Sequence, residues 1–212
     1  MKNFIILALS FIVIGLSIYV SVLILGKGEA GGSEKFFLSE WALYPDNHLA
    51  LAKEDVEKRA YNLGAYEIEK SVNMMRSIES VTDEEGVALV EEAIKRLTSI
   101  EEEIKLRDID IPKLEEASIQ AMNTLALVHL KLSDELAREG DNKKAMKSVR
   151  TAIKHLQNAF DMASLGSQRV GEALIINELQ VLLDSLESNG HLEGKDYTIS
   201  VNDLVKLINS NK

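Results

Sequence analysis

Four histidines are the residues of this chain best suited to metal binding or proton transfer, because an imidazole can act as a metal ligand or as an acid and base. They are His48, His129, His155 and His191. His129 and His155 lie at comparable distances on either side of Gly140, so a helical hairpin turning at this glycine would bring them close together. No histidine follows a glutamate at the spacing of the ferritin-like Glu-x-x-His motif. We therefore expect His129 and His155 to be ordinary residues of a helix surface or interface.

The sequence contains none of the familiar motifs for other chemistries. It has no cysteine, which excludes disulfides and thiolate reactions. His-Glu-x-x-His, Gly-x-Ser-x-Gly and glycine-rich phosphate loops are also absent from it. The run Glu101-Glu102-Glu103 points its carboxylates in different directions around a helix, so we expect a solvated face. These features predict a protein without catalysis, without a cofactor and without a metal.

The N-terminus carries a long apolar segment. Residues 4–25 contain no charged side chain, and as a helix they would be roughly 33 Å long, enough to cross a hydrocarbon core of about 30 Å. A cleaved signal peptide is the alternative, although its apolar region usually spans only about 7–15 residues. We predict an uncleaved single-pass membrane anchor over residues 1–26. Because the preceding tail is very short, we expect the bulk of the chain to be extracytoplasmic.

Residues 27–46 are predicted to form a tether followed by an aromatic juxtamembrane segment. The first part is rich in glycine and lacks large apolar side chains, which is typical of a flexible linker. In the second part, a short helix ending before Pro45 would place Phe37, Trp41 and Tyr44 on one side. Three interpretations stay open for these rings: packing against the core or the end of a bundle, insertion at the membrane interface, and binding to a partner. They are the candidate partner-binding residues of the chain.

The remaining residues, 47–212, are predicted to be an all-α bundle of about five antiparallel helices, because apolar residues recur with the helical period over long stretches. Asp46 or Asn47 is suited to cap the first helix, and Thr82 with Glu85 has the spacing of a capping box for the second. The predicted helices cover about residues 47–79, 82–107, 112–139, 142–164 and 167–188, with a short helix after residue 200.

The third predicted helix, residues 112–139, carries two neighbouring apolar stripes. One contains Leu114, Ala117, Ala121, Leu125, Val128 and Leu132, and the other contains Ile119, Met122, Ala126 and Leu130. A helix that is apolar on two faces contacts more than one neighbour, so we place it at the centre of the bundle. Gly140 is suited to the left-handed position that ends this helix, and Asp141 to the cap of the next.

The two halves of the bundle share a local sequence similarity. Residues 84–97 align with residues 143–156 at an offset of 59, with Ala-Ile-Lys identical in both segments. One interpretation is a duplication of a helical hairpin. The other is that amphipathic helices built from Ala, Lys, Glu and Leu resemble one another by chance.

Residues 140–153, GDNKKAMKSVRTAI, resemble the turn and second helix of a tetratricopeptide repeat. In that family a Gly-Asp-like turn precedes two small residues seven positions apart, and Gly140-Asp141, Ala145 and Ala152 occupy these places. The resemblance occurs in one copy and covers about residues 121–156. It implies a helical scaffold that holds a peptide or a partner helix.

The formal net charge of −10 at pH 7 bears on possible partners. A negative surface repels phosphate backbones, so we expect no nucleic-acid partner. The sequence as a whole favours a membrane-anchored helical scaffold that positions or recruits a partner protein of unknown identity. The alternative function is a small-ligand or metal sensor or carrier domain of a membrane complex. Small residues in the anchor, such as Gly15 and Ser21, also leave a homo-oligomer open.

Overall fold

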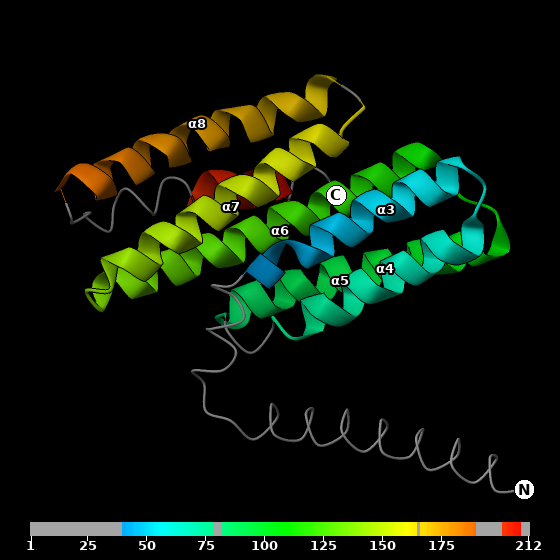
Figure 1. Cartoon of the computed structure of the whole chain (residues 1–212), viewed down its shortest axis with the longest axis horizontal. Coiled ribbons are helices and arrows are strands. Elements are labelled where there is room, and N and C mark those ends of the chain that lie inside the picture. Colours follow the sequence, from blue (N-terminus) through cyan, green and yellow to red (C-terminus); the bar gives the residue numbers. More distant parts are fainter. Residues whose placement is uncertain (1–39, 79–81, 165, 190–200, 209–212) are drawn as a thin grey trace, which may run out of the picture.

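A computed structural model gives the architecture of residues 40–78, 82–164, 166–189 and 201–208. Within these ranges the chain forms helices and no strand, which confirms the predicted all-α bundle. Figure 1 shows the long helices running nearly side by side along the longest axis of the molecule. In chain order they are η1 (Glu40–Leu43), α3 (Tyr44–Glu57), α4 (Tyr61–Arg76), α5 (Glu84–Leu106), α6 (Ile111–Arg138), α7 (Asn142–Met162) and α8 (Gly166–Asn189), followed by a helix over residues 201–208.

The predicted membrane anchor over residues 1–26 lies outside the described residues, as does the glycine-rich part of the tether. Among the helices that are described, none combines the length and the apolar character needed to cross a bilayer. The predicted tail helix is described over residues 201–208, where Leu204 and Ile208 are buried.

Helix α6 lies at the centre of the bundle, as its two apolar stripes predict. Every side chain from residue 117 to residue 130 is buried, which requires neighbours on all sides of the helix. Helices α3, α5 and α7 contact α6, and its contact with α7 is the most extensive in the molecule. Helix α7 carries α8 on its outer side, while α4 packs against α3 and α5 at the opposite edge (Figure 1).

The prediction of one helix over residues 47–79 is wrong, because the structure divides this segment into the antiparallel hairpin α3–α4. The chain reverses at Arg59, which adopts a φ of 62°. The Arg59 N–H donates to the Val56 carbonyl at 2.9 Å, and the Ala60 N–H donates to the Asp55 carbonyl at 2.7 Å. These two bonds form a Schellman motif, which satisfies the last carbonyls of α3. An arginine therefore occupies the position that usually belongs to glycine.

The turn at Arg59 also changes which residues of α4 reach the core. Leu63, which follows the buried Val56 by two helical turns in the sequence, is exposed, whereas Gly64 and Ala65 are buried. A Cβ atom at Gly64 would lie 2.8 Å from Val56 Cγ2 and 3.2 Å from the Ala52 carbonyl oxygen. The missing side chain thus permits the close approach of α3 and α4.

Helices α5 and α6 end in the same motif as α3. Arg107 ends α5 with a φ of 60°, and Gly140 ends α6 with a φ of 85°, as predicted for this glycine. The Arg107 N–H donates to the Ile104 carbonyl at 3.0 Å, and the Gly140 N–H donates to the Ala137 carbonyl at 3.1 Å. Two of these three helix ends therefore place arginine in the left-handed conformation, where a Cβ atom is disfavoured.

Exchanging residues at these helix ends should change stability in opposite directions. We expect Arg59→Gly to raise the free energy of unfolding by about 0.5 kcal/mol, because relief of about 1–2 kcal/mol of backbone strain exceeds the entropy cost of a glycine. Gly140→Ala should lower it by about 1 kcal/mol. Urea unfolding followed by circular dichroism measures both changes. A loss of stability in Arg59→Gly would contradict the strain at this turn.

The helix caps bear on the proposed duplication. Asp83, and not Thr82, caps α5, since its carboxylate accepts a 2.8 Å hydrogen bond from the Gly86 N–H. Asp141 caps α7 as predicted and accepts from the Lys144 N–H at 3.2 Å. An offset of 59 therefore does not superpose the two caps. In addition, a duplicate of the α6–α7 hairpin would consist of two helices, but the described chain before α6 forms three, α3, α4 and α5. The two predicted copies of the hairpin therefore differ in architecture.

Candidate functional site

His129 of α6 and His155 of α7 lie side by side in the core of the bundle. Their ring centroids are 5.2 Å apart, the ring planes are inclined by 30°, and neither residue is exposed. The hairpin around Gly140 brings them together, and of the two predicted locations they occupy the helix interface and not the surface. The sequence contained a signal for this burial, because His129 continues an apolar stripe four residues after Leu125 and three before Leu132.

Asp46 of α3 is the third member of this buried polar group. Both of its carboxylate oxygens lie 2.8 Å from His155 Nδ1, and Oδ2 also accepts a 2.8 Å hydrogen bond from Asn158 Nδ2. Asp46 is only 2% exposed. Neither Asp46 nor Asn47 is the N-cap predicted from the sequence, because α3 begins earlier and Leu43 occupies that position. Asp46 instead lies in the first turn of α3 and connects this helix to α7.

Ser148 determines which nitrogen of His129 carries a proton in the neutral ring. The Ser148 hydroxyl donates to the His129 carbonyl oxygen at 2.7 Å, so its only hydrogen is used. Its oxygen therefore accepts from His129 Nδ1, which lies 3.2 Å away. His155 also donates through Nδ1, to Asp46, and its Nε2 is buried without a hydrogen-bond partner among the described residues.

Burial lowers the pKa of His129 well below its ordinary value, and the neighbouring His155 lowers this pKa further. The cause is that a charge on His129 would lose its hydration in the core and would stand next to a second imidazole. His129 is therefore neutral at pH 7. The two histidines together carry at most one positive charge at this pH.

The low pKa of His129 makes stability depend on pH. Between its folded pKa and the unfolded value of about 6.5, the unfolded chain binds one more proton than the folded chain does. The free energy of unfolding should therefore decrease as the pH falls below about 6.5, by up to about 1.4 kcal/mol per pH unit from this residue. Urea unfolding between pH 7.5 and 5 measures the slope. His129→Phe should flatten it, and an unchanged slope in this variant would assign the effect to other groups.

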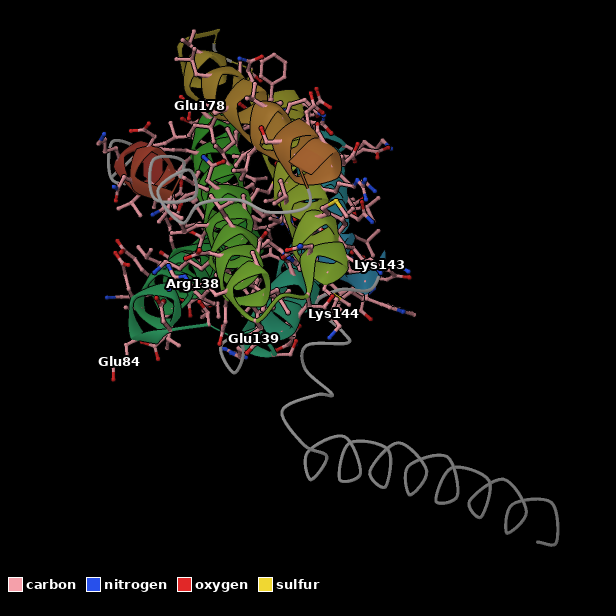
Figure 2. The ribbon with its side chains drawn as sticks, turned by 90° about the vertical axis from the view of Figure 1, so that its left-hand side faces the viewer. Glu84, Arg138, Glu139, Lys143, Lys144 and Glu178 are labelled. Carbon is pink, nitrogen blue, oxygen red and sulfur yellow. The ribbon has the colours of Figure 1, made fainter. Side chains whose placement is uncertain are left out.

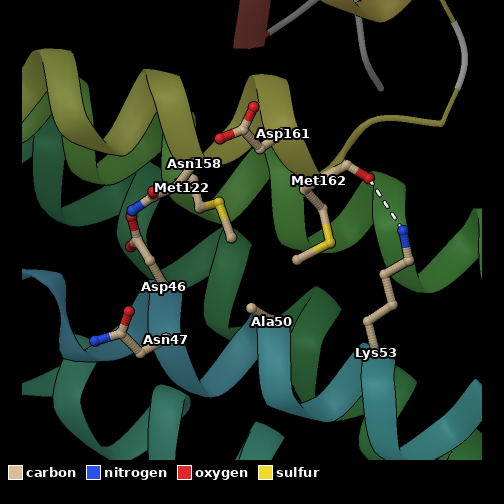
Figure 3. Close-up of a pocket in the computed structure, with 8 residues that line it drawn as sticks. All are labelled: Asp46, Asn47, Ala50, Lys53, Met122, Asn158, Asp161 and Met162. Atoms are coloured by element: carbon tan, nitrogen blue, oxygen red, sulfur yellow. Dashed lines mark hydrogen bonds between the residues drawn. The ribbon is translucent and has the colours of Figure 1, made fainter.

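A pocket of about 230 Å³ lies between α3 and α7, directly beside Asp46 (Figure 3). Helices α3, α6 and α7 contribute its lining residues, which are Asp46, Asn47, Ala50, Lys53, Met122, Asn158, Asp161 and Met162. Figure 3 shows Asp46 and Asn158 at one end, Lys53 at the other, and Met122 and Met162 between them. Both methionines are buried and form the apolar part of this pocket.

The positive charge of Lys53 is balanced inside the protein. Its Nζ atom lies 2.6 Å from Glu115 Oε1 and donates to the Met162 carbonyl oxygen at 3.4 Å, the bond drawn in Figure 3. Burial by itself would raise the pKa of Glu115, but hydrogen bonds from Lys53 and Ser164 outweigh it and hold this pKa below its ordinary value. Glu115 therefore stays ionised beside Lys53. The remaining carboxylates of the pocket, Asp46 and Asp161, make its lining net negative.

The other candidate metal ligands of the chain are two further histidines and the acidic run. No group of three or more His, Asp and Glu side chains is placed to hold a metal ion in the described part of the chain. His48 Nδ1 lies 2.5 Å from Glu67 Oε2, whereas His191 lies outside the described residues. Glu101 is buried and pairs with Lys105, so the prediction of a solvated face is wrong for this member of the acidic run.

Trp41 of the aromatic segment does not fill the core of the bundle. Trp41 is 51% exposed and stacks on Tyr44, with ring centroids 4.5 Å apart, and His48 meets Tyr44 edge-on at 6.0 Å. Phe37 lies outside the described residues. The prediction of a short helix that ends before Pro45 is wrong, because η1 leads directly into α3. Pro45 lies in the first turn of α3, where a missing N–H is tolerated. Partner binding by Phe37, Trp41 and Tyr44 stays a prediction.

The outer face of α8 presents a second candidate site, which sequence periodicity did not single out. Val170, Leu174 and Val181 are each at least 60% exposed. With Asn177 they follow the 4-3-4 spacing of a heptad seam, so they share one face of the helix. Glu178, labelled on α8 in Figure 2, lies beside this seam and is exposed. We call Val170, Leu174, Asn177 and Val181 the α8 seam.

Comparison of the chain with protein-family models, curated proteins and solved structures finds no match. The tetratricopeptide resemblance therefore rests on the residues that carry it. Gly140 has the left-handed conformation expected of the turn, and Ala145 and Ala152 are fully buried in the bundle. Ser133 Oγ also donates to the Ala145 carbonyl oxygen at 2.9 Å, which ties α6 to α7 at this point. These local features agree with a close helical hairpin, while membership of a repeat stays a prediction.

Proposed function

We propose that this chain is a membrane-anchored helical protein without catalytic activity that recruits a partner protein through the α8 seam. The observation that carries this proposal is the exposure of Val170, Leu174 and Val181 on one face of a helix. The opposite face of α8 is already buried by the bundle through Ile175, Leu179, Leu182 and Leu183. The exposed seam is thus apolar surface beyond what α8 needs to pack, and apolar residues recurring on one face of a helix are typical of helix-binding sites.

The spacing and charge of the α8 seam indicate the kind of partner. An amphipathic helix with apolar residues at heptad spacing would interdigitate with Val170, Leu174 and Val181. Glu178 beside the seam and Asp184 at its end are both exposed and acidic. Basic side chains flanking the partner's apolar stripe would complement them, and the net charge of −10 favours a basic partner more generally. The same charge disfavours nucleic acid.

The uncharged run over residues 4–25 supports attachment of this scaffold to a membrane. With the predicted short tether, an anchored bundle would meet partners close to the bilayer. We propose an extracytoplasmic location for the bundle and a partner that belongs to a membrane complex. The exposed stack of Trp41 on Tyr44 is a further candidate contact for it.

Site-specific photocrosslinking in the full-length protein tests this function. A photoreactive amino acid at position 174 should yield one discrete adduct with another polypeptide in membranes of the native cell. The same group at Leu106, which is 78% exposed on α5, is the matched control and should yield none. Glu178→Lys should reduce the adduct, whereas Glu91→Lys, an exposed change on α5, should not.

Two results would contradict the proposal. Identical adducts from positions 174 and 106 would show that the crosslinks reflect exposure and not a specific surface. An adduct that contains only copies of this chain would assign the α8 seam to self-association.

A further inference from the structure

The outward face of α7 carries a row of basic side chains in an otherwise acidic chain. Helix α7 contains five lysines and arginines and a single acidic residue, whereas the whole chain has a formal net charge of −10. Four of these bases recur at the 4-3-4 spacing that places side chains on one face of a helix, and all four are exposed. They are Lys143, Lys147, Arg150 and Lys154, which we call the α7 basic row, and Lys143 is labelled in Figure 2.

Most of the charge of the α7 basic row is not neutralised within the described part of the chain. Arg150 pairs with Glu187 of α8. The side chains of Lys143, Lys147 and Lys154 form no salt bridge with any described acidic residue. The row extends about 17 Å along the helix. Electrostatic interactions at a protein surface are screened over about 8 Å at physiological ionic strength, so a partner that approaches α7 responds to this local charge more than to the net charge of the chain. The row therefore attracts an anionic partner.

The exposed stack of Trp41 on Tyr44 lies beside the α7 basic row. The hydrogen bonds from Asp46 and from Lys53 to α7 each join residues 109 positions apart in the sequence, so α3 and α7 run parallel. The same offset places Trp41 at about the level of Arg150, within the row. Element η1, which carries Trp41, also contacts α7 directly. Because Trp41 is 51% exposed, its ring and the lysines are presented together on this side of the bundle.

The combination of basic and aromatic side chains favours a lipid surface over an acidic protein. Trp and Tyr prefer the zone between headgroups and hydrocarbon, and lysines attract anionic headgroups. The place of this face in the chain favours lipid as well. The described chain begins at Glu40, next to Trp41, and only residues 26–39 separate it from the uncharged run over residues 4–25. A segment of this length spans at most about 50 Å, so an anchored run would keep the face within reach of the bilayer.

We propose that the α7 basic row and the stack of Trp41 on Tyr44 form a face of the bundle that lies on an anionic lipid surface. The lysines meet the headgroups, and the two rings enter the interfacial zone. This inference rests on the proposed attachment of the chain to a membrane. It leaves the α8 seam as the site for a partner protein and assigns the aromatic stack to contact with lipid.

Trp41 is the only tryptophan of the chain, so its fluorescence reports on this contact without a label. The full-length protein is reconstituted in vesicles of phosphatidylcholine alone, or of phosphatidylcholine with about 30% phosphatidylglycerol. Both kinds contain the same fraction of lipid brominated close to the headgroup, which quenches tryptophan at short range. We expect quenching of Trp41 to be at least about twofold stronger in the anionic vesicles. Raising NaCl from about 0.1 M to about 0.5 M should remove this difference, because salt screens the lysines.

Lys147→Glu reverses one charge of the α7 basic row and should remove at least about half of the difference between the two kinds of vesicle. Lys95→Glu, an exposed change of the same charge on α5, is the matched control and should leave the difference unchanged. Alkaline carbonate extraction of the same vesicles tests the membrane anchor separately, because it strips proteins that are held only by surface charge. Release of the protein would overturn the anchor, whereas a retained protein without charge-dependent quenching would overturn the lipid face alone.

Two further results would overturn the lipid face. One is an equal effect of Lys147→Glu and Lys95→Glu on the quenching of Trp41. The other is a shift of Trp41 emission by soluble polyglutamate that Lys147→Glu removes, in a protein whose quenching does not depend on anionic lipid. This result would assign the α7 basic row to an acidic protein.

Discussion

Asp46→Ala should lower the free energy of unfolding by about 3–5 kcal/mol, the cost expected when one partner of a buried polar pair is removed. The substitution leaves His155 Nδ1 and the Asn158 amide without the carboxylate that accepts their hydrogen bonds. It also removes the described polar link between the start of α3 and the middle of α7. His155 cannot recover the loss by turning to solvent, because it is fully buried, whereas the half-buried Asn158 amide can reach water through the pocket.

Two further substitutions separate the causes of this effect. Asp46→Asn keeps the shape and one acceptor, so its cost should be smaller, about 1–3 kcal/mol. Asp161→Ala removes an exposed aspartate from the same pocket and should change stability by no more than about 0.5 kcal/mol. Urea unfolding at pH 7 measures all three. A loss below about 1 kcal/mol for Asp46→Ala would show that the buried pair contributes little to the fold.

Leu125→Ala is expected to cost about 3–5 kcal/mol, because it removes three carbon atoms from the most enclosed helix of the bundle. Leu125 is fully buried within the stretch of α6, residues 117–130, that has no exposed side chain. Neighbours on every side limit how far the structure can relax into the cavity. Leu106→Ala, at an exposed position of α5, deletes the same atoms and should cost less than about 0.5 kcal/mol. Equal losses in the two variants would contradict the central position of α6.

The apolar periodicity and the conformational preferences of single residues predicted helix bounds and helix ends, which depend mainly on neighbouring residues in the sequence. The bounds of α6 and α7, the left-handed Gly140 and the Asp141 cap all follow from periodicity and from residues with strong conformational preferences. The break between α3 and α4 does not follow from such signals. Arg59 is neither glycine nor asparagine, so nothing in the residue type indicates a left-handed turn. The tertiary packing of α4 against α3 overrides the local preference for a continuous helix.

The candidate sites were harder to predict because they depend on how distant helices dock. Burial of His129 can be read from its place on an apolar stripe. Its neighbour His155, however, is held by Asp46, which lies 109 residues away in the sequence and which resembles an ordinary helix cap. The pocket beside Asp46 exists only once α3 lies against α7. The exposure of Val170 and Leu174 depends likewise on which face of α8 meets the bundle.

The contacts between α3 and α7 also bear on the order of folding. Most neighbouring helices in this bundle are consecutive in the sequence and form antiparallel hairpins, whose contacts need only short loops to close. The contacts from Asp46 to His155 and from Lys53 to Met162 each close a loop of 109 residues. Because closing such long loops costs entropy, we expect these contacts to form late, after the local hairpins. Loss of the Asp46 carboxylate should therefore act mainly by accelerating unfolding, with little effect on the folding rate.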